Sequence, residues 1–404
     1  MRVLVIGAGA SGMIAALTAA EDPNNRVTLL ERHARVGRKL AATGNGRCNL
    51  TNLYTDLSRY HGEDPAFITP ALEQFGVSDT LRWFRSLGLV TVAEDSGKVY
   101  PFSDQAGSVV DVLRLAIEQS DIDLQTGSEV ISLTWREDAF FARTQERLYA
   151  ADRVIIACGG KAGGKLGGTG AGYYFLKGFG HTCTKLYPVL VQLKTDPTWV
   201  RSLKGVRAEA EILLTCGEEL LQKNRGEVQF AEYGLTGPAI FEISRAVSVT
   251  EGDLCVTLDL MPQLTEEELF EELSAKMQRF PALLLENYLT GMVQNRLGRT
   301  VIRACGLPLE VPASCLKKKD LRAIATMLKA FRFPVTGTMG MDYAQVTAGG
   351  IKTDEFDPRT LESKLIPGLY ACGEVLDIDG DCGGLNLQWA WSSGRLAGKL
   401  GGTT

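Results

Sequence analysis

Three glycines near the start of the chain, with one acid that follows them, have the types and spacing of a nucleotide-binding turn. The segment VLVIGAGASG places Gly7, Gly9 and Gly12 after a short apolar run, and Glu31 follows about 20 residues after Gly12. In this pattern one glycine makes the tight turn, one lets the backbone approach a pyrophosphate, and one lets helix and strand touch, while the acid binds ribose. The chemistry indicated is dinucleotide binding at a helix N-terminus. The alternative is a glycine-rich strand–helix turn without a ligand.

A second glycine-rich segment lies near the carboxyl end. Residues 368–398, GLYACGEVLDIDGDCGGLNLQWAWSSGRLAG, predict a strand, a turn at Gly373 and Glu374, and an apolar helix that begins near Asn386. We expect Glu374 to accept hydrogen bonds from ribityl hydroxyls, and the backbone N–H groups of Gly384 through Leu387 to face the N1 and C2=O edge of a flavin. Such donors would raise the reduction potential of the flavin. The alternative is a turn that only packs a terminal helix.

The two segments together indicate FAD, with its ADP half at the first and its isoalloxazine at the second. The loop between them that follows Glu31, residues 31–52, is dense in Gly, Asn, Arg and Lys. Its Arg38, Lys39 and Arg47 follow a pyrophosphate turn and are expected to neutralise phosphate and to cap polar edges of the flavin. A solvated basic loop is the alternative.

Cys48 in this loop has two interpretations. A redox thiol beside the flavin would match the disulfide reductases of this superfamily, but their pattern CxxxxC requires a second cysteine that is absent here. A small packing residue is the preferred interpretation.

The remaining chain predicts further strands and an inserted region. Residues 128–134 predict a strand that nominates Val130 for contacts to adenine, and residues 153–157 predict a strand that returns beside the first. The glycine-rich stretch 157–182, which includes Gly159, lacks the spacing of a second dinucleotide motif and is expected to pass near the flavin ring. From about residue 190 the pattern is that of an antiparallel barrel or sandwich. The expected domains are 1–190 with 346–404, then 191–262 with 331–345, and a helical insert at 263–330.

Composition limits the functional classes. The net charge is −5 and no basic block stands out, so we expect no nucleic-acid partner. No apolar run approaches the length of about 20 residues needed to cross a bilayer, and a first strand at residue 3 leaves no room for a signal peptide. The nine scattered cysteines form no CxxC pair, so we expect reduced thiols, no metal site and a cytoplasmic protein.

Several long motifs make the chain resemble a known family. They are GAGASG (7–12), GRKLAATGNGRCNLTN (37–52), FSDQAGSVVDVL (102–113), YGLTGPAIFEIS (233–244), QVTAGGI (345–351) and GEVLDIDGDCGGLNLQWAWSSG (373–394). With them the sequence resembles the BaiN/YhiN-type FAD-dependent flavoproteins of the glutathione-reductase superfamily, distant kin of fumarate-reductase flavoproteins. The resemblance implies an α/β fold with a discontinuous Rossmann-like FAD domain, a β-barrel insert and a small helical insert. It also implies non-covalent FAD.

The cofactor-binding positions expected from the motifs and from the resemblance are spread over the two ends of the chain. They are Gly7, Gly9, Ser11, Gly12, Glu31, Arg32, Arg38, Lys39, Asn45, Gly46, Arg47, Cys48, Val130, Gly159, Gly373, Glu374, Gly384, Asn386 and Leu387.

Two positions depart from the family. Its Thr-His pair before the GLSGPA-type segment is Ala231-Glu232 here, and its aromatic residue in GGYNLQ is Leu385. Both positions are expected near the boundary between the insert and the flavin. The substrate preference of the family is therefore not carried over to this chain.

The resemblance implies an oxidoreductase that uses NAD(P)H, as a transient electron donor, to reduce an activated, enone-like C=C bond in a small molecule. The alternative is an FAD-binding module without turnover, either a redox sensor or a partner in flavin-dependent RNA modification. No proton donor is assigned: the carboxyl-terminal motif holds no histidine, His181 is expected to be structural, and Tyr173, Tyr187, Tyr233 and Arg47 are equal candidates. The oligomeric state is not predicted.

Overall fold

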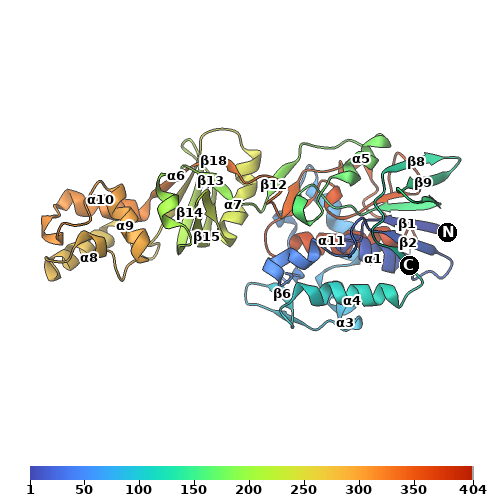
Figure 1. The fold of residues 1–404 in the computed structure, drawn as a ribbon, viewed down its shortest axis with the longest axis horizontal. Coiled ribbons are helices and arrows are strands. Elements are labelled where there is room, and N and C mark those ends of the chain that lie inside the picture. Colours follow the sequence, from blue (N-terminus) through green and yellow to red (C-terminus); the bar gives the residue numbers. More distant parts are fainter. Residues whose placement is uncertain (403–404) are drawn as a thin grey trace. The chain divides into compact units, whose positions relative to one another are not determined.

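The computed structural model describes residues 1–402, which form two compact units. The first unit combines residues 1–188 with the segment from 341 onward, and the second consists of residues 189–340 (Figure 1). The two ends of the chain therefore fold together, and the second unit is inserted between them in sequence. The separation of residues 263–330 as a domain of their own remains a prediction.

A five-stranded parallel sheet forms the centre of the first unit, in the order β20–β11–β1–β2–β7. Its central strands are continuous apolar runs with almost no exposed side chain, as in sheets covered on both faces. The strands are β1 (Arg2–Ile6), β2 (Arg26–Leu30), β7 (Asp123–Gln125), β11 (Arg153–Ile156) and β20 (Leu369–Ala371). Because the strands are parallel, β1 and β20 end at the same edge, which brings the first glycine turn and the turn at Gly373 to one side of the sheet.

Helices and small sheets surround this core (Figure 1). The helices are α1 (Ala10–Ala19), α2 (Thr69–Gln74), α3 (Val77–Ser86), α4 (Ala106–Glu118), α5 (Ala171–Gly178) and α11 (Leu385–Gly398). The small sheets are built from β8 (Ser132–Arg136), β9 (Ala139–Arg143) and β10 (Leu148–Ala151); from β3 (Thr51–Asn52), β5 (Thr91–Ala93) and β6 (Lys98–Pro101); from β4 (Tyr60–His61) and β21 (Asp379–Gly380); and from β12 (Tyr187–Val189) and β19 (Val346–Ala348). No helix within residues 1–402 is long and apolar enough to span a membrane.

The first and last helices of the first unit cross in direct backbone contact. A Cβ placed on Gly394 would lie 2.4 Å from the carbonyl oxygen of Ser11, and one on Gly398 would lie 2.6 Å from that of Ala15. Only glycine fits at such an approach, because any side chain would collide with backbone. The small residues of α1 and α11 thus fix the start of one helix against the other.

A closed six-stranded barrel forms the centre of the second unit, in the order β13–β16–β15–β14–β17–β18. The alternating strand pattern of the sequence left both a barrel and a sandwich possible, and the closed strand order shows a barrel. A closed barrel has no unpaired strand edge. The elements are β13 (Leu193–Thr195), α6 (Pro197–Val200), β14 (Arg207–Cys216), β15 (Glu219–Ala231), β16 (Gly234–Thr236), α7 (Pro238–Val249), β17 (Leu254–Asp259) and β18 (Phe331–Thr338).

A helical segment connects β17 to β18. It contains α8 (Glu266–Arg279), α9 (Asn295–Ala304) and α10 (Lys318–Lys329). Thr265 caps α8 as its sequence predicts: its hydroxyl accepts from the backbone N–H of Glu268, and the Glu268 carboxylate accepts from the N–H of Thr265. The expected α/β fold with a barrel insert and helices is confirmed.

Candidate cofactor site

The amino-terminal glycine turn leaves a helix start open. At Gly7, with φ of +104°, a Cβ would lie 2.6 Å from the carbonyl oxygen of Ala157, and at Gly12 it would lie 1.8 Å from that of Gly7. Gly9 differs, because a Cβ there would meet no atom within 4 Å. Gly9 is also the N-cap of α1 and provides no side-chain acceptor for the first N–H groups of the helix. The turn therefore has open space beside the backbone N–H donors at the start of α1.

Glu31 is fixed beside this turn. It follows β2, is 8% exposed, and accepts hydrogen bonds from the backbone N–H groups of Ala8 at 2.9 Å and His33 at 2.8 Å. Its carboxylate is thus held at the carboxyl edge of the sheet, one strand away from the glycine turn. This is the location expected of a ribose-binding acid.

The basic residues after Glu31 fall into separate groups. Arg32 and Arg38 both contact the imidazole of His33, at 3.2 Å and 3.3 Å. Arg47 lies elsewhere: it pairs with Asp104 and Glu94, and its guanidinium stacks over the ring of Tyr100. Two neighbouring carboxylates thus compensate the charge of Arg47, and Glu129 lies 3.6 Å from the guanidinium of Arg32.

Lys39 connects the amino-terminal loop to the carboxyl-terminal strand turn. Its ammonium lies 2.6 Å from Oε2 of Glu374, while Oε1 of Glu374 accepts from the backbone N–H of Thr347 at 2.8 Å. A Cβ on Gly373 would lie 2.6 Å from the hydroxyl of Ser11, in the first turn of α1. Four of the expected positions, from both ends of the chain, are therefore brought together here: Ser11, Lys39, Gly373 and Glu374.

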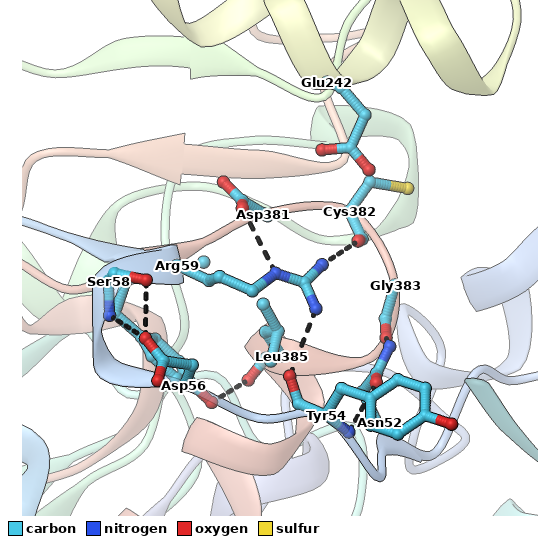
Figure 2. A network of polar contacts seen from close by, with 12 residues as sticks. Asn52, Tyr54, Asp56, Ser58, Arg59, Glu242, Asp381, Cys382, Gly383 and Leu385 are labelled. Atoms are coloured by element: carbon cyan, nitrogen blue, oxygen red, sulfur yellow. Dashed lines mark hydrogen bonds and ion pairs between the residues drawn. The ribbon is translucent and has the colours of Figure 1, made fainter. Parts of the chain in front are cut away.

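The loop before α11 is held by side chains from the amino-terminal half. Asn52 donates to the carbonyl of Gly383 at 2.9 Å, and Arg59 reaches the carboxylate of Asp381 and the carbonyl of Cys382 (Figure 2). The side chain of Asn386 accepts from the N–H of Gly380 and donates to its carbonyl, which closes the loop from within. The side chain of Asn386 therefore holds the backbone of the loop before α11 in place.

The end of this loop is the start of α11. Gly384 is the N-cap, with φ of +99° and no side-chain acceptor for the first N–H groups of the helix. A Cβ at Gly384 would lie 2.6 Å from the backbone of Thr51, so the position requires glycine. Leu387 is half-buried in the first turn. The structure thus forms a second open helix start.

The remaining expected positions differ in environment. Gly46 and Gly159 have positive φ, and a Cβ at either would meet no atom within 4 Å, while Asn45 is exposed and left-handed. Val130 is mostly buried just before β8. Cys48 is fully buried, and burial raises the pKa of its thiol to about 12. A thiol that stays protonated at neutral pH fits a packing residue and not a redox centre.

The positions that depart from the family pattern lie in different environments. Leu385 is fully buried, so its side chain contacts the core of the first unit. Glu232 follows β15, pairs with Lys204 at 2.7 Å, and lines a cavity of about 450 Å³ in the barrel unit together with Arg201 and Tyr233. Glu232 is thus exposed, whereas Leu385 is not.

The sequence did not predict one contact between a histidine and an aspartate. Nε2 of His61 lies 2.8 Å from Oδ1 of Asp381, in the loop before α11. No sequence signal links the two, because β4 and β21 meet only in the folded chain, where His61 is opposite Asp379. A histidine is therefore present beside the carboxyl-terminal motif after all.

The residues present fit FAD. Open space at Gly9, Gly46 and Gly159 leaves room along the turn and its neighbouring loops, and two glycine-capped helix starts offer unfilled donors. Oδ1 of Asn49 is a buried acceptor without a hydrogen-bond partner among residues 1–402, and it lies beside Gly384. A ligand with phosphates at one end and ring N–H and C=O groups at the other matches this donor and acceptor set.

Comparisons with known proteins identify the family and the fold of the chain. The family profile described as HI0933-like protein Rossmann domain matches residues 1–400. The chain is 40% identical to a 3-dehydro-bile acid delta(4,6)-reductase of Clostridium scindens, over 98% of both chains. It is 30% identical to a ribosomal RNA dihydrouridine synthase of Escherichia coli, over 96% of this chain and 95% of the relative. Its fold is similar to that of the E. coli quinol fumarate reductase subunit FrdA, with a TM-score of 0.50 and 17% identity, covering 99% of this chain and 69% of the other.

Proposed function

This chain belongs to the HI0933-like Rossmann-domain family, and from that premise we propose that it reduces an activated C=C bond in a small organic molecule, with FAD as its cofactor and NAD(P)H as electron donor. The chain is a flavin-dependent oxidoreductase. The observation that carries the proposal is the meeting of the two chain ends in one site, through the Lys39–Glu374 pair and the contact of Gly373 with Ser11.

Each group of residues has a task in this proposal. Glu31 would bind a ribose, the open start of α1 would bind the pyrophosphate, and Glu374 would accept from ribityl hydroxyls. The start of α11 would place N–H donors at the N1 and C2=O edge of the ring, where charge accumulates on reduction. Bound FAD, once reduced by NAD(P)H, would supply a hydride to one carbon of the alkene. The roles of the individual residues are proposals.

The names of the relatives support this substrate class. The name of the C. scindens relative describes reduction of double bonds conjugated with a 3-oxo group. A carbonyl conjugated with an alkene draws electrons from the far carbon, which then accepts a hydride. We therefore place a small enone first among the substrates, and the cytoplasm as the compartment, in keeping with the free cysteines.

A second candidate is the reduction of uridine in ribosomal RNA, favoured by the 30% identity to a relative with that name. The C5=C6 bond of uracil is conjugated with a carbonyl, so the same chemistry applies. The net charge of −5 argues against it, because RNA binding depends on neutralising phosphates. The further alternative, an FAD module without turnover, predicts flavin reduction by dithionite and by neither NADH nor NADPH.

The test is an anaerobic experiment in two stages. NADH or NADPH is first mixed with the holoenzyme, and loss of the visible flavin absorbance is recorded. The reduced enzyme is then mixed with a steroid dienone, with cyclohexenone, or with ribosomal RNA transcribed without modifications. Return of the absorbance with an enone supports the first candidate, and return with RNA alone supports the second. Reduction by dithionite, with no reduction by NADH or NADPH, would exclude NAD(P)H as donor.

A further inference from the structure

His61 and Asp381 form an acid–base pair whose members come from opposite ends of the chain. Their strands, β4 and β21, pair as a short antiparallel ladder, and Nε2 of His61 lies 2.8 Å from Oδ1 of Asp381. The other carboxylate oxygen, Oδ2, lies 3.4 Å from Nε of Arg59 (Figure 2). Asp381 is thus fixed from two sides, and it fixes the plane of the imidazole in turn.

The pair belongs to the loop that sets the start of α11. Asp381 is directly followed by Cys382, whose carbonyl accepts from Arg59, and by Gly383, whose carbonyl accepts from Asn52. The next residue, Gly384, is the N-cap of the helix. The carboxylate that holds the imidazole of His61 therefore stands three residues before the N-cap of α11.

The imidazole of His61 is accessible, unlike that of His181. The side chains of His61 and Asp381 are 30% and 31% exposed. His181 has a similar carboxylate partner, Glu355, at 2.8 Å, but its side chain is 0% exposed, and its Nε2 contacts the hydroxyl of Ser363. One pair can meet a substrate, whereas the other has both nitrogens occupied in the core.

We propose that His61 is the proton donor of the alkene reduction and that Asp381 is its positioning residue. This inference rests on the proposed function. Hydride addition to the far carbon of the enone places an electron pair on the carbon next to the carbonyl, as an enolate. The imidazolium of His61 gives its Nδ1 proton to that carbon, and the neutral ring keeps its Nε2–H bond to Asp381. One hydride and one proton are added, dihydroflavin is oxidised by two electrons, and the imidazole regains a proton from water.

The kinetic test separates the two half-reactions in His61→Gln and Asp381→Asn, with Glu118→Gln as a control at an exposed ion pair on α4. His61→Gln is expected to keep its FAD and its reduction by dithionite, and to slow reoxidation by cyclohexenone about 10²- to 10⁴-fold. Asp381→Asn is expected to show a smaller loss. Glu118→Gln is expected to match the wild type in both half-reactions.

Two further readouts distinguish proton donation from a structural effect. In D₂O the wild type should place deuterium on one face of the carbon next to the carbonyl, and His61→Gln should give both faces, because water then supplies the proton. Diethyl pyrocarbonate should modify His61 in the holoenzyme, and saturating cyclohexanone, the reduced product, should protect it. Buried His181 is the control and should stay unmodified with and without the ketone.

The outcomes separate the two proposals. If the wild-type reduced flavin is reoxidised by neither enones nor RNA, the proposed function fails and this inference falls with it. If the wild type reduces cyclohexenone while His61→Gln keeps the rate and the single deuterium face, the function stands and the role of His61 is overturned. Lack of protection by cyclohexanone likewise overturns it.

Discussion

The ammonium of Lys39 lies 2.6 Å from the carboxylate of Glu374, although 335 residues separate the two along the chain. This pair connects the loop after the first βαβ unit to the turn after the last core strand. Both residues belong to the expected cofactor site. Substitutions at this pair therefore test whether the two ends of the chain bind the cofactor together.

Replacing either partner should weaken FAD binding far more than folding. Lys39→Gln and Glu374→Gln are each expected to lower the affinity for FAD about ten- to a hundredfold, as for lost hydrogen bonds to charged groups. Glutamine keeps a hydrogen-bonding group at either position, and both side chains retain contact with solvent, so the free energy of unfolding of the apoprotein should change by only about 1 kcal/mol. Titration of apoprotein with FAD and thermal unfolding measure the two effects. Unchanged affinity in both variants would remove the pair from the site.

Replacing Glu31 should weaken FAD binding and also lower the stability of the fold. Glu31→Ala leaves the N–H groups of Ala8 and His33 without their acceptor, which is expected to destabilise the apoprotein by about 1–3 kcal/mol and to release FAD. Glu31→Gln keeps an acceptor for one N–H and should retain more of the stability while still weakening ribose binding. FAD content after gel filtration, together with chemical unfolding, checks both. Full FAD occupancy in Glu31→Ala would exclude the ribose role.

Gly394 should not tolerate a side chain. Gly394→Ala places a methyl group 2.4 Å from the Ser11 carbonyl and forces α1 and α11 apart, at an expected cost of about 1–3 kcal/mol. Because this crossing positions both helix starts, FAD affinity should fall as well. Gly107→Ala in α4 is the control: a Cβ there meets no atom within 4 Å, so the variant should be neutral or more stable by up to about 1 kcal/mol. Equal unfolding midpoints for Gly394→Ala and wild type would contradict the packing argument.

The pair of His181 and Glu355 should make the fold sensitive to acid. Burial lowers the pKa of His181, against the opposing pull of Glu355, so the folded protein binds fewer protons than the unfolded chain below pH about 6.5. Burial alone would raise the pKa of Glu355, but hydrogen bonds from Thr182 and His181 outweigh it and lower that pKa, which adds a second loss as pH falls through that lowered value. The lowered pKa of His181 and the lowered pKa of Glu355 both make the folded state less stable as the pH falls.

The measurement is the unfolding free energy of the apoprotein from pH 7.5 to pH 5.5 in wild type and His181→Gln. One proton corresponds to a slope of at most about 1.4 kcal/mol per pH unit, and the variant should lose that part of the slope. The exposed Arg2–Asp152 pair provides the control, because Arg2→Gln should leave the profile in this range unchanged. An identical slope in His181→Gln and wild type would show that His181 titrates normally.

The sequence by itself determined the parts that depend on local order. The strand–turn–helix with Gly7, Gly9 and Gly12, the acid after β2, the last core strand before Gly373 and the cap of α8 by Thr265 were all predicted from short segments. These features arise from hydrogen bonds and steric limits between neighbours a few residues apart, which a local pattern records. The strand pattern alone left a barrel and a sandwich open, because strand alternation is the same in both, and the barrel was predicted from the family resemblance.

Only the tertiary structure decided which distant side chains meet. It paired Lys39 with Glu374 and brought His61 to Asp381 through strands of two residues each. It also turned Arg47 toward Asp104 and Glu94, and it buried Leu385. Such contacts depend on the parallel order of the sheet and on the close crossing of α1 and α11. Residues that meet across this packing carry no shared periodicity, so their spacing in the sequence holds no record of the contact.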